Sequence, residues 1–368
     1  MSWNWQSDKW PNFTYNKTQL SDFEAEFLAE SSVVFGAYQH IDNNDKKNII
    51  IELITEEAVN TSEIEGEILD RESVQSSIRN NFGLHTNNKK IPENEKGISD
   101  MMIDLYDTYN KNLSNEYLYN WHKKLALGRS DIKNIGKYRT HDEPMQVVSG
   151  PIHKPKIHYE APPSRIIPIE MERYSEWFNE ASQMSANKLN TIINAGIAHL
   201  YFVLIHPFED GNGRIGRALS EKLISSSFHY PVLLPISSVI QKNKKEYYDT
   251  LEEHNKKLEI TDYLIYFSKL VLEAQKLTGK TIEFTIKKTK IYDKYSELLN
   301  ERQLKVLSKI FEAGINGFKG GLSANNYKSI VKNTSDSTVT RDLQGMVSIG
   351  LLNKTGELKH ARYYINNL

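Results

Sequence analysis

Apolar residues in this chain recur mostly at the spacing of about three to four positions that places them on one face of a helix. The pattern is clearest over residues 49–79, where we predict helix, and Asn80 and Gly83 mark its end. Its apolar positions are Ile50, Leu53, Ile54, Val59, Ile64, Ile68 and Val74. The other stretches predicted as helices are 98–112, 114–127, 168–184, 187–205, 213–227, 242–257 and 260–278. We therefore expect a mainly α fold.

Two regions depart from this helical pattern. Between residues 138 and 167, short β-prone runs alternate with Gly and Pro, and the run from Met145 to Gly150 predicts a β-hairpin flap between helices. The end of the chain shows three short helical patterns followed by two β-prone runs, the order of a winged helix-turn-helix domain. The helical patterns cover 301–313, 323–331 and 335–346; residues 350–352 then lead to 354–357, with a β-prone run at 363–365 after it, which predicts a two-stranded wing.

Length and composition are those of a folded, soluble protein with more than one domain. The chain has 368 residues, 39% of them hydrophobic and 25% charged, and single cores rarely grow beyond about 250–300 residues. It contains no cysteine, which excludes disulfides, thiolate metal sites and cysteine nucleophiles. No apolar run approaches the roughly 20 residues that cross a bilayer, and the N-terminus lacks signal-peptide features. We therefore expect a cytoplasmic protein with no membrane partner.

Charge is unevenly distributed along the chain. The net charge of −1 argues against a protein whose whole surface serves nucleic acid. Residues 300–368, however, contain ten Lys or Arg and only five acidic residues, a modest basic excess. This segment therefore has two candidate partners, DNA or another protein.

The residues best suited to chemistry lie in one polar segment, His206 to Arg217, with the sequence HPFEDGNGRIGR. Apolar, helix-forming stretches flank it on both sides, so we expect a tight loop between two helices. Gly211 and Gly213 lack the side chains that would block close approach. Backbone N–H groups at the start of the second helix can then surround an anion.

Four titratable or charged residues of this segment indicate chemistry at phosphate. Arg214 and Arg217 are three positions apart and lie on one side of the second helix, where both can reach phosphate oxygens. Asp210 is suited to Mg²⁺, which prefers one or two carboxylates together with phosphate oxygens. His206 can accept a proton from a hydroxyl at neutral pH, because its usual pKa is about 6.5. Together they predict phosphoryl or nucleotidyl transfer.

The same segment resembles the signature of the Fic family, His-x-Phe-x-Asp/Glu-Gly-Asn-Gly-Arg-x-x-Arg, and agrees with it at every fixed position. The resemblance implies a mostly helical Fic core and an enzyme that transfers AMP from ATP to a Ser, Thr or Tyr hydroxyl of a target protein or of itself, with Mg²⁺ as cofactor. His206 would be the general base, Phe208 would anchor the loop and Asp210 would hold Mg²⁺. The residues that would bind ATP in this segment are Asp210, Gly211, Asn212, Gly213, Arg214, Ile215, Gly216 and Arg217.

Two further segments resemble parts of the same family. The run from Met145 to Gly150 is similar to the flap that aligns a target segment by strand addition, and Tyr247-Tyr248 with Asn255 is similar to the adenine side of the ATP site. The flap residues assigned to the site are Val147, Val148, Ser149 and Gly150. Two plainer interpretations stay open: the two valines as part of a buried strand, and the two tyrosines as helix packing residues.

An upstream segment resembles the family's autoinhibitory pattern, Ser/Thr-x-x-x-Glu-Gly/Asn. It is Thr61-Ser62-Glu63-Ile64-Glu65-Gly66, and the resemblance implies that Glu65 pairs with Arg217. An arginine held by a carboxylate is not available to the γ-phosphate, so ATP would bind in an unproductive pose. The alternative is that Glu65 is an ordinary solvated acid on a helix.

The sequence thus predicts four parts: an N-terminal cap over residues 1–48, a Fic catalytic domain with its inhibitory helix over 49–279, a linker helix over 280–299, and a winged-helix domain over 300–368. Three functions remain open. The first is protein adenylylation restrained by Glu65. The second is removal of AMP, or transfer of another phosphate-linked group, on the same fold. The third is a DNA-binding regulator, and a homodimer is compatible with each.

Overall fold

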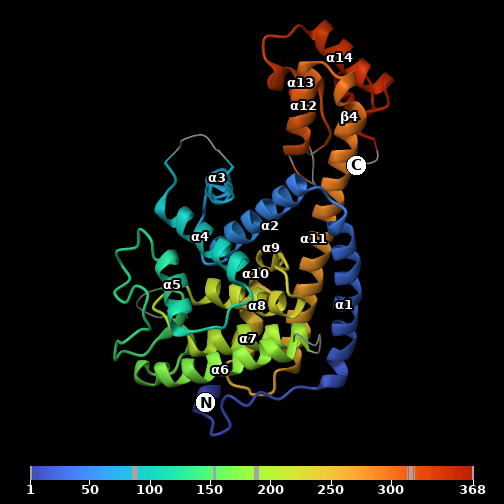
Figure 1. Cartoon of the computed structure of the whole chain (residues 1–368). Coiled ribbons are helices and arrows are strands. Elements are labelled where there is room, and N and C mark those ends of the chain that lie inside the picture. Colours follow the sequence, from blue (N-terminus) through green and yellow to red (C-terminus); the bar gives the residue numbers. More distant parts are fainter. Residues whose placement is uncertain are drawn as a thin grey trace. The chain divides into compact units, whose positions relative to one another are not determined.

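A computed structural model of the chain describes residues 2–84, 90–151, 155–185, 190–312, 314, 318 and 320–366. The fold is mainly helical, as the sequence predicts, with two short β-hairpins. The chain forms two compact units (Figure 1). Unit 1 comprises Met1–Phe35 and Ile50–Thr278, and unit 2 comprises Gly36–Ile49 and Gly279–Leu368. The predicted boundaries near residues 48, 279 and 299 stay predictions.

Unit 1 is a helical assembly around two buried helices, α7 and α8. Almost every residue of α7 is buried, as expected of a helix that is apolar on all sides. Helix α8 packs along α7, and α6 packs against both (Figure 1). The helices of this unit are α3 (Arg71–Asn81), α4 (Glu93–Thr108), α5 (Asn115–Leu125), α6 (Ile167–Ser185), α7 (Thr191–Ile205), α8 (Asn212–Phe228), α9 (Ile236–Lys242) and α10 (Lys244–His254). Three more, α1 (Lys17–Gln39), α2 (Asn43–Ile64) and α11 (Thr261–Tyr295), belong partly to each unit.

The helix predicted over residues 49–79 is two helices. Helix α2 ends at Ile64 and α3 begins at Arg71, because Gly66 adopts φ +85, a left-handed conformation that ends a helix. Asp70 then caps α3, its side chain accepting a hydrogen bond from the Ser73 N–H at 2.7 Å. The break places Glu65 in a turn and not on a helix face.

Two other helix boundaries differ from prediction. The helix predicted over 260–278 continues as α11 to Tyr295, since Ile282, Ile291 and Tyr295 extend the helical pattern of buried positions through the Lys-rich stretch. The helix predicted over 242–257 is α10, and the preceding α9 was missed because its seven residues, which follow Pro235, are too few to show a helical period. No helix among the described residues is both long and apolar enough to cross a bilayer.

The predicted flap is a β-hairpin. Strand β1 (Gln146–Ser149) pairs antiparallel with β2 (Lys156–Glu160), and the register shifts between Val147 and Val148. Val147 and Val148 are 36% and 50% exposed, so the alternative of a buried strand is wrong. Within the described residues β1 pairs with β2 alone, which leaves its other edge open.

The N-terminal tryptophans Trp3, Trp5 and Trp10 pack against the core of unit 1. The indole N–H of Trp5 donates to the carbonyl of Glu160 at 2.7 Å, and that of Trp10 donates to the Glu170 carboxylate at 2.8 Å. The ring of Trp10 also meets Tyr201 of α7 edge to face. The first residues of the chain are therefore part of the core of unit 1.

Unit 2 has its own hydrophobic core. Helices α12 (Glu301–Glu312), α13 (Ala324–Val331) and α14 (Asp336–Ser348) are followed by the antiparallel pair β3 (Leu352–Thr355) and β4 (Arg362–Ile365). Val306, Tyr327, Leu343 and Met346 are almost fully buried among them. The predicted order of three helices and a hairpin is present, and its assignment to the winged-helix class stays a prediction.

Because the two cores are separate, we predict two separable unfolding transitions. Leu343→Ala in unit 2 should lower the stability of one transition by about 2–5 kcal/mol, the usual cost of a buried Leu→Ala change. Leu219→Ala in α8, which is also fully buried, is the matched variant for the other transition. Differential scanning calorimetry of the full chain checks this, and a single transition that both variants lower equally would contradict it.

Candidate functional site

The site is built on the tight reversal of the chain between α7 and α8. His206 ends α7 with φ +51 and Gly211 precedes α8 with φ +84, so both residues use the left-handed conformation that sharp turns require. The Asn212 side chain closes the loop on itself: Oδ1 accepts from the Phe208 N–H at 2.9 Å and Nδ2 donates to the Phe208 carbonyl at 2.8 Å. The side chain of Asn212, the first residue of α8, therefore holds the loop closed.

Buried side chains from other segments support this loop from below. Phe208 is fully buried and stacks on His122 of α5, with ring centroids 4.2 Å apart, which is the anchoring role the sequence predicts for Phe208. Arg139 donates from Nε to the His206 carbonyl at 2.8 Å, and its backbone N–H donates to the Pro207 carbonyl at 3.0 Å. The sequence analysis did not identify His122 or Arg139, because neither lies in a recognisable motif.

His206 is held in the neutral form that a general base needs. Its Nδ1 lies 3.2 Å from the Val203 carbonyl oxygen, which can only accept, so the ring proton is assigned to Nδ1 and the lone pair to Nε2. Burial lowers the pKa of His206 to about 4. At neutral pH, Nε2 is therefore available to accept a proton.

Arg217 lies deep under the loop and is fully paired. Its side chain is 1% exposed; Nη2 donates to Glu65 Oε1 at 2.8 Å and to the Thr61 carbonyl at 2.9 Å. Nε donates to the Thr61 hydroxyl at 2.8 Å. The contact that the resemblance implies between Glu65 and Arg217 is thus present. Gly213 makes it possible, because a Cβ there would lie 2.2 Å from Glu65 Oε1.

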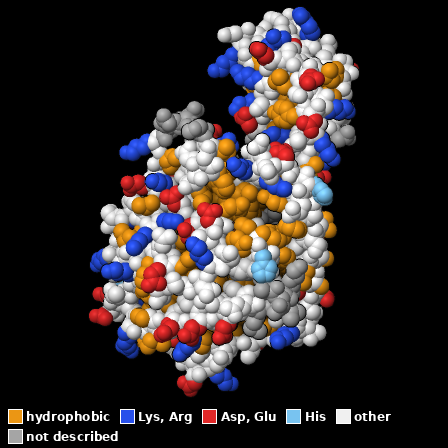
Figure 2. All heavy atoms as spheres, viewed as in Figure 1, with side chains coloured by type: hydrophobic (Ala, Val, Ile, Leu, Met, Phe, Trp, Pro, Cys, Tyr) orange, Lys and Arg blue, Asp and Glu red, His pale blue; other side chains and the backbone are white. Residues whose placement is uncertain are grey.

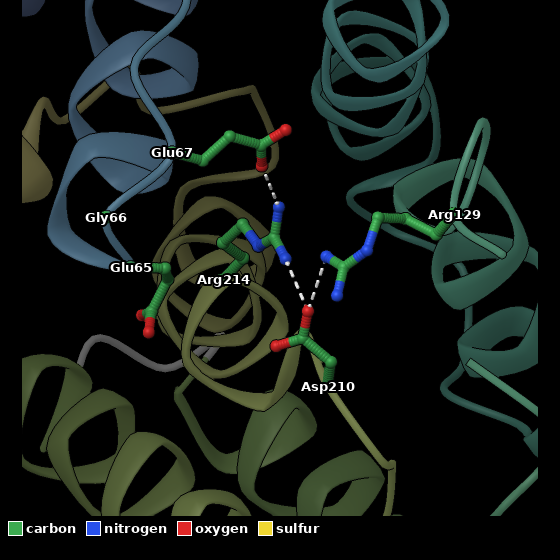
Figure 3. A pocket seen from close by; sticks show the side chains of 6 residues that line it. All are labelled: Glu65, Gly66, Glu67, Arg129, Asp210 and Arg214. Carbon is green, nitrogen blue, oxygen red and sulfur yellow. Dashed lines mark hydrogen bonds and ion pairs between the residues drawn. The ribbon is translucent and has the colours of Figure 1, made fainter. Parts of the chain in front are cut away.

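A second series of ion pairs lies at the opening of the site (Figure 3). Arg214, 4% exposed, donates to Glu67 Oε2 at 2.7 Å and lies 3.4 Å from Asp210 Oδ2. The same Asp210 oxygen accepts from Arg129 Nη1 at 2.7 Å. Arg129 in turn makes a two-pronged ion pair with Asp131. The result is a continuous row of alternating charges.

These groups line a pocket of about 340 Å³, within the usual range of about 300–1,000 Å³ for small-molecule sites. Its lining residues are Glu65, Gly66, Glu67, Arg129, Asp210 and Arg214. Sequence reasoning missed Glu67 and Arg129. The signal for Glu67 was its place two residues after Glu65 on the same turn, whereas nothing in the local sequence distinguishes Arg129.

Asp210 is the residue that the sequence predicts as the Mg²⁺ ligand, and this role stays a prediction. Its burial opposes ionisation, but Arg214, the Gly211 N–H and Arg129 outweigh this effect and lower its pKa, so the carboxylate is charged at neutral pH. Among the described residues no cluster of three or more His, Asp or Glu side chains is arranged for a metal. One carboxylate fits Mg²⁺ only if other oxygens come with the ligand, as phosphate oxygens do.

The other predicted residues lie around this pocket without lining it. The Tyr247 hydroxyl is 3.4 Å from Arg217 Nη1, and the Tyr248 hydroxyl donates to the Ile64 carbonyl at 3.2 Å. Asn255 is buried and donates to the His158 carbonyl of β2 at 3.0 Å. The side chain of Ile215 lies in the core and Gly216 packs against Val203 of α7. The ATP contacts of these residues and of Val147 to Gly150 stay predictions.

Comparison with known sequences supports the assignment of this region. The sequence model of the Fic/DOC family matches residues 112–224, and that of a domain of unknown function (DUF4172) matches residues 3–84. A protein adenylyltransferase of Caenorhabditis briggsae, fic-1, is 32% identical over 130 residues, which are 35% of this chain and 22% of that protein. The protein adenylyltransferase Fic of Drosophila mojavensis is 34% identical over 87 residues, 24% of this chain and 16% of that protein. The chain thus matches about a fifth of the length of these relatives.

Solved structures of Fic proteins share the fold. One from Desulfovibrio desulfuricans G20 covers 97% of this chain and 98% of its own, with a TM-score of 0.55 and 17% identity. A Fic-domain signalling protein from Bacteroides thetaiotaomicron covers 70% of this chain and 98% of its own, with a TM-score of 0.54 and 18% identity. Residues 112–224 therefore match the Fic/DOC family in sequence, and the chain shares the fold of solved Fic proteins.

Proposed function

We propose that this chain is a protein adenylyltransferase that moves AMP from ATP to a hydroxyl of a protein. The observation that carries the proposal is geometric: His206, with Nδ1 against the Val203 carbonyl, lies in the loop that leads into the first turns of α8, and this helix carries Arg214 and Arg217, which suit phosphates. The curated relatives that share this domain are named protein adenylyltransferases, which supports AMP transfer over other phosphate chemistry.

In the proposed reaction, His206 Nε2 removes the proton of a Ser, Thr or Tyr hydroxyl. The oxygen attacks the α-phosphorus of ATP, a new O–P bond forms, and the bond from the α-phosphorus to the bridging oxygen of the β-phosphate breaks. Pyrophosphate leaves and AMP remains on the protein. Arg214 and Arg217 would neutralise the leaving phosphates, and backbone N–H groups of Gly211 to Gly213 would surround them.

Asp210 is the residue that would hold Mg²⁺ in this reaction. Its single ionised carboxylate would share the ion with phosphate oxygens, and the ion supplies charge neutralisation at those oxygens. In the structure, Arg129 and Arg214 are the cations paired with that carboxylate.

The open edge of β1 is the proposed docking site for the target segment. An unpaired edge offers backbone groups that can pair with an extended peptide. Exposed Val147 and Val148 offer apolar contacts along that edge. The identity of the target is not encoded in these features, because strand addition recognises backbone.

Glu65 and Glu67 are proposed to restrain the enzyme together. Around the pocket, Arg129, Arg214 and Arg217 provide three positive charges, and Asp131, Asp210, Glu65 and Glu67 provide four negative charges. The site therefore carries a net charge of −1 and offers no net attraction to a polyphosphate. Removal of the two glutamates would change the net charge to +1, which favours a negatively charged nucleotide triphosphate.

A second proposed function is nucleic-acid binding by unit 2. Residues 279–368 contain fifteen Lys or Arg and eight acidic residues, although the whole chain carries −1, and Figure 2 shows Lys and Arg side chains across the visible face of this unit. Ser337, Thr340, Arg341 and Gln344 form an exposed polar face of α14, the helix that would enter a major groove.

We predict that His206→Ala lowers AMP transfer by about 10²- to 10⁴-fold, the usual contribution of a general base, and leaves ATP affinity nearly unchanged. The base acts on the incoming hydroxyl and not on the donor. Transfer of α-labelled but not γ-labelled phosphate from ATP to protein measures the reaction and separates it from phosphorylation. Near-normal turnover of the variant, or labelling from the γ-position, would contradict the proposal.

We predict that Glu65→Gly raises self-adenylylation at least about tenfold, because Arg217 is then free for the γ-phosphate. Without ATP the variant should lose at most about 3 kcal/mol of stability, since Thr61 and Tyr247 still accept from Arg217. Glu67→Gln should produce a smaller gain through Arg214. Intact mass after incubation with Mg-ATP records added AMP.

Glu63→Gly is the matched control for the Glu65 variant, because Glu63 is an exposed acid on the same segment. Arg217→Ala in the Glu65→Gly background should remove the gain. If Glu63→Gly activates the protein as strongly as Glu65→Gly, the gain comes from loosening of α2, and the role assigned to the Glu65–Arg217 pair is wrong.

We predict that the full chain binds a short mixed-sequence DNA duplex at low salt, with an affinity that falls steeply as salt rises. Arg341→Ala should weaken binding and reduce the salt dependence by about one charge. Lys245→Ala on α10, which changes an exposed lysine of unit 1, is the control that should leave the DNA affinity unchanged. Fluorescence anisotropy measures the DNA affinity of each variant and its salt dependence. Absence of binding at low salt would indicate that unit 2 serves protein contacts.

A further inference from the structure

We propose that Arg129 is a phosphate-binding residue of the nucleotide site and closes this site from the wall opposite α8. Arg129 follows α5, outside the segment from His206 to Arg217, and no motif in the sequence includes it. The inference rests on the proposed function, because it takes the ligand of the pocket to be a nucleotide triphosphate.

The first support is the convergence of two guanidinium groups on one oxygen atom. Arg129 Nη1 and Arg214 Nη2 lie 2.7 Å and 3.4 Å from Asp210 Oδ2 and converge on it from two different segments of the chain (Figure 3). Two guanidinium groups around one anionic oxygen form a cradle that accepts a phosphate oxygen equally well. The Asp210 carboxylate therefore occupies, in the ATP-free protein, a position where both arginines can hold an anion.

The second support is that Arg129 is already oriented for this task. Its Nε and Nη2 donate to the two oxygens of Asp131 at 2.8 Å and 2.6 Å. This two-pronged pair fixes the plane of the guanidinium and leaves Nη1 directed into the pocket. Fixing the group beforehand lowers the entropy that must be lost when a ligand binds.

The third support is accessibility. The side chain of Arg129 is 31% exposed, whereas those of Arg214 and Arg217 are 4% and 1% exposed and are paired with Glu67 and Glu65. Arg129 is therefore the cation of the site that an arriving polyphosphate meets while both glutamates are still in place. When the polyphosphate binds, Arg129 Nη1 exchanges its partner Asp210 Oδ2 for a phosphate oxygen. The charge of Arg129 is therefore paired before and after binding.

A residue in this position distinguishes ATP from AMP. The β- and γ-phosphates carry most of the charge of ATP, and AMP lacks them. Loss of Arg129 should weaken ATP binding strongly and AMP binding little. A residue that only supported the loop would affect both nucleotides alike.

The test measures nucleotide binding by isothermal titration calorimetry in the Glu65→Gly background, with ATP and with AMP, in EDTA and again with Mg²⁺. Arg129→Ala should weaken ATP binding by about tenfold or more, the usual effect of losing a hydrogen bond between charged groups, and AMP binding by less than about threefold. Arg173→Ala is the matched control: Arg173 is a partly exposed arginine of α6 in an ion pair with Glu170 and should change neither affinity.

A double-mutant cycle with Asp210→Asn separates direct contact from an effect through Asp210. If Arg129 contacts phosphate, Arg129→Ala still weakens ATP binding about tenfold in the Asp210→Asn background in EDTA. If Arg129 only neutralises Asp210, its removal has no further effect there, and the proposal is overturned. Thermal melts report folding, and Arg129→Lys, which keeps the charge but loses the fork, should lie between the parent and Arg129→Ala.

The parent variant separates this inference from the proposed function. If the Glu65→Gly protein binds no ATP, the proposed function fails and the role of Arg129 fails with it. If the parent binds ATP and Arg129→Ala binds it with equal affinity, the role of Arg129 alone is wrong.

Discussion

The sharp reversal of the chain between α7 and α8 is the constraint on which the site depends. Because α7 is buried on all sides, the chain has to leave it and enter α8 within a few residues. His206 adopts a left-handed conformation to do so, at a cost of about 1–2 kcal/mol for a residue with a side chain. Hydrogen bonds from Arg139 to the His206 carbonyl and between Phe208 and Asn212 offset this cost. The same turn sets His206 Nδ1 against the Val203 carbonyl and so decides which ring nitrogen is basic.

Burial of the arginines explains the charge pattern around the pocket. A guanidinium as buried as that of Arg214 or Arg217 must be paired, because an unpaired buried charge destabilises the fold strongly. In the absence of a ligand, only protein carboxylates and neutral acceptors can provide the partners. Glu65 and Glu67 therefore stabilise the fold and also occupy the positions that an anionic ligand would take. Their removal would free these positions for an anion but would lower the stability of the folded protein.

The turn from Glu65 to Glu67 is the local feature that brings both carboxylates to α8. Gly66 in the left-handed conformation ends α2 and directs the side chains on either side of it to different arginines. A continuous helix through this point would separate Glu65 and Glu67, which are two positions apart, by about 200° and could not direct both toward α8. Gly213 completes the arrangement from the other side, since any side chain there would collide with Glu65.

The sequence alone determined the helical class, the loop from His206 to Arg217 and the flap, because each depends on local patterns: apolar periodicity, paired glycines and arginines, and β-prone runs between Gly and Pro. It also related Glu65 to Arg217 across about 150 positions, but only through resemblance to a family. The break of the helix at Gly66 was missed, because the apolar period continues across it and only the φ of one residue interrupts it. Glu67, Arg129, His122 and Arg139 entered the site only with the tertiary structure, since α5, the loop after it and the end of α2 are distant in sequence from α8. Which acid meets which arginine is decided by packing between those segments, and no periodicity within one segment encodes it.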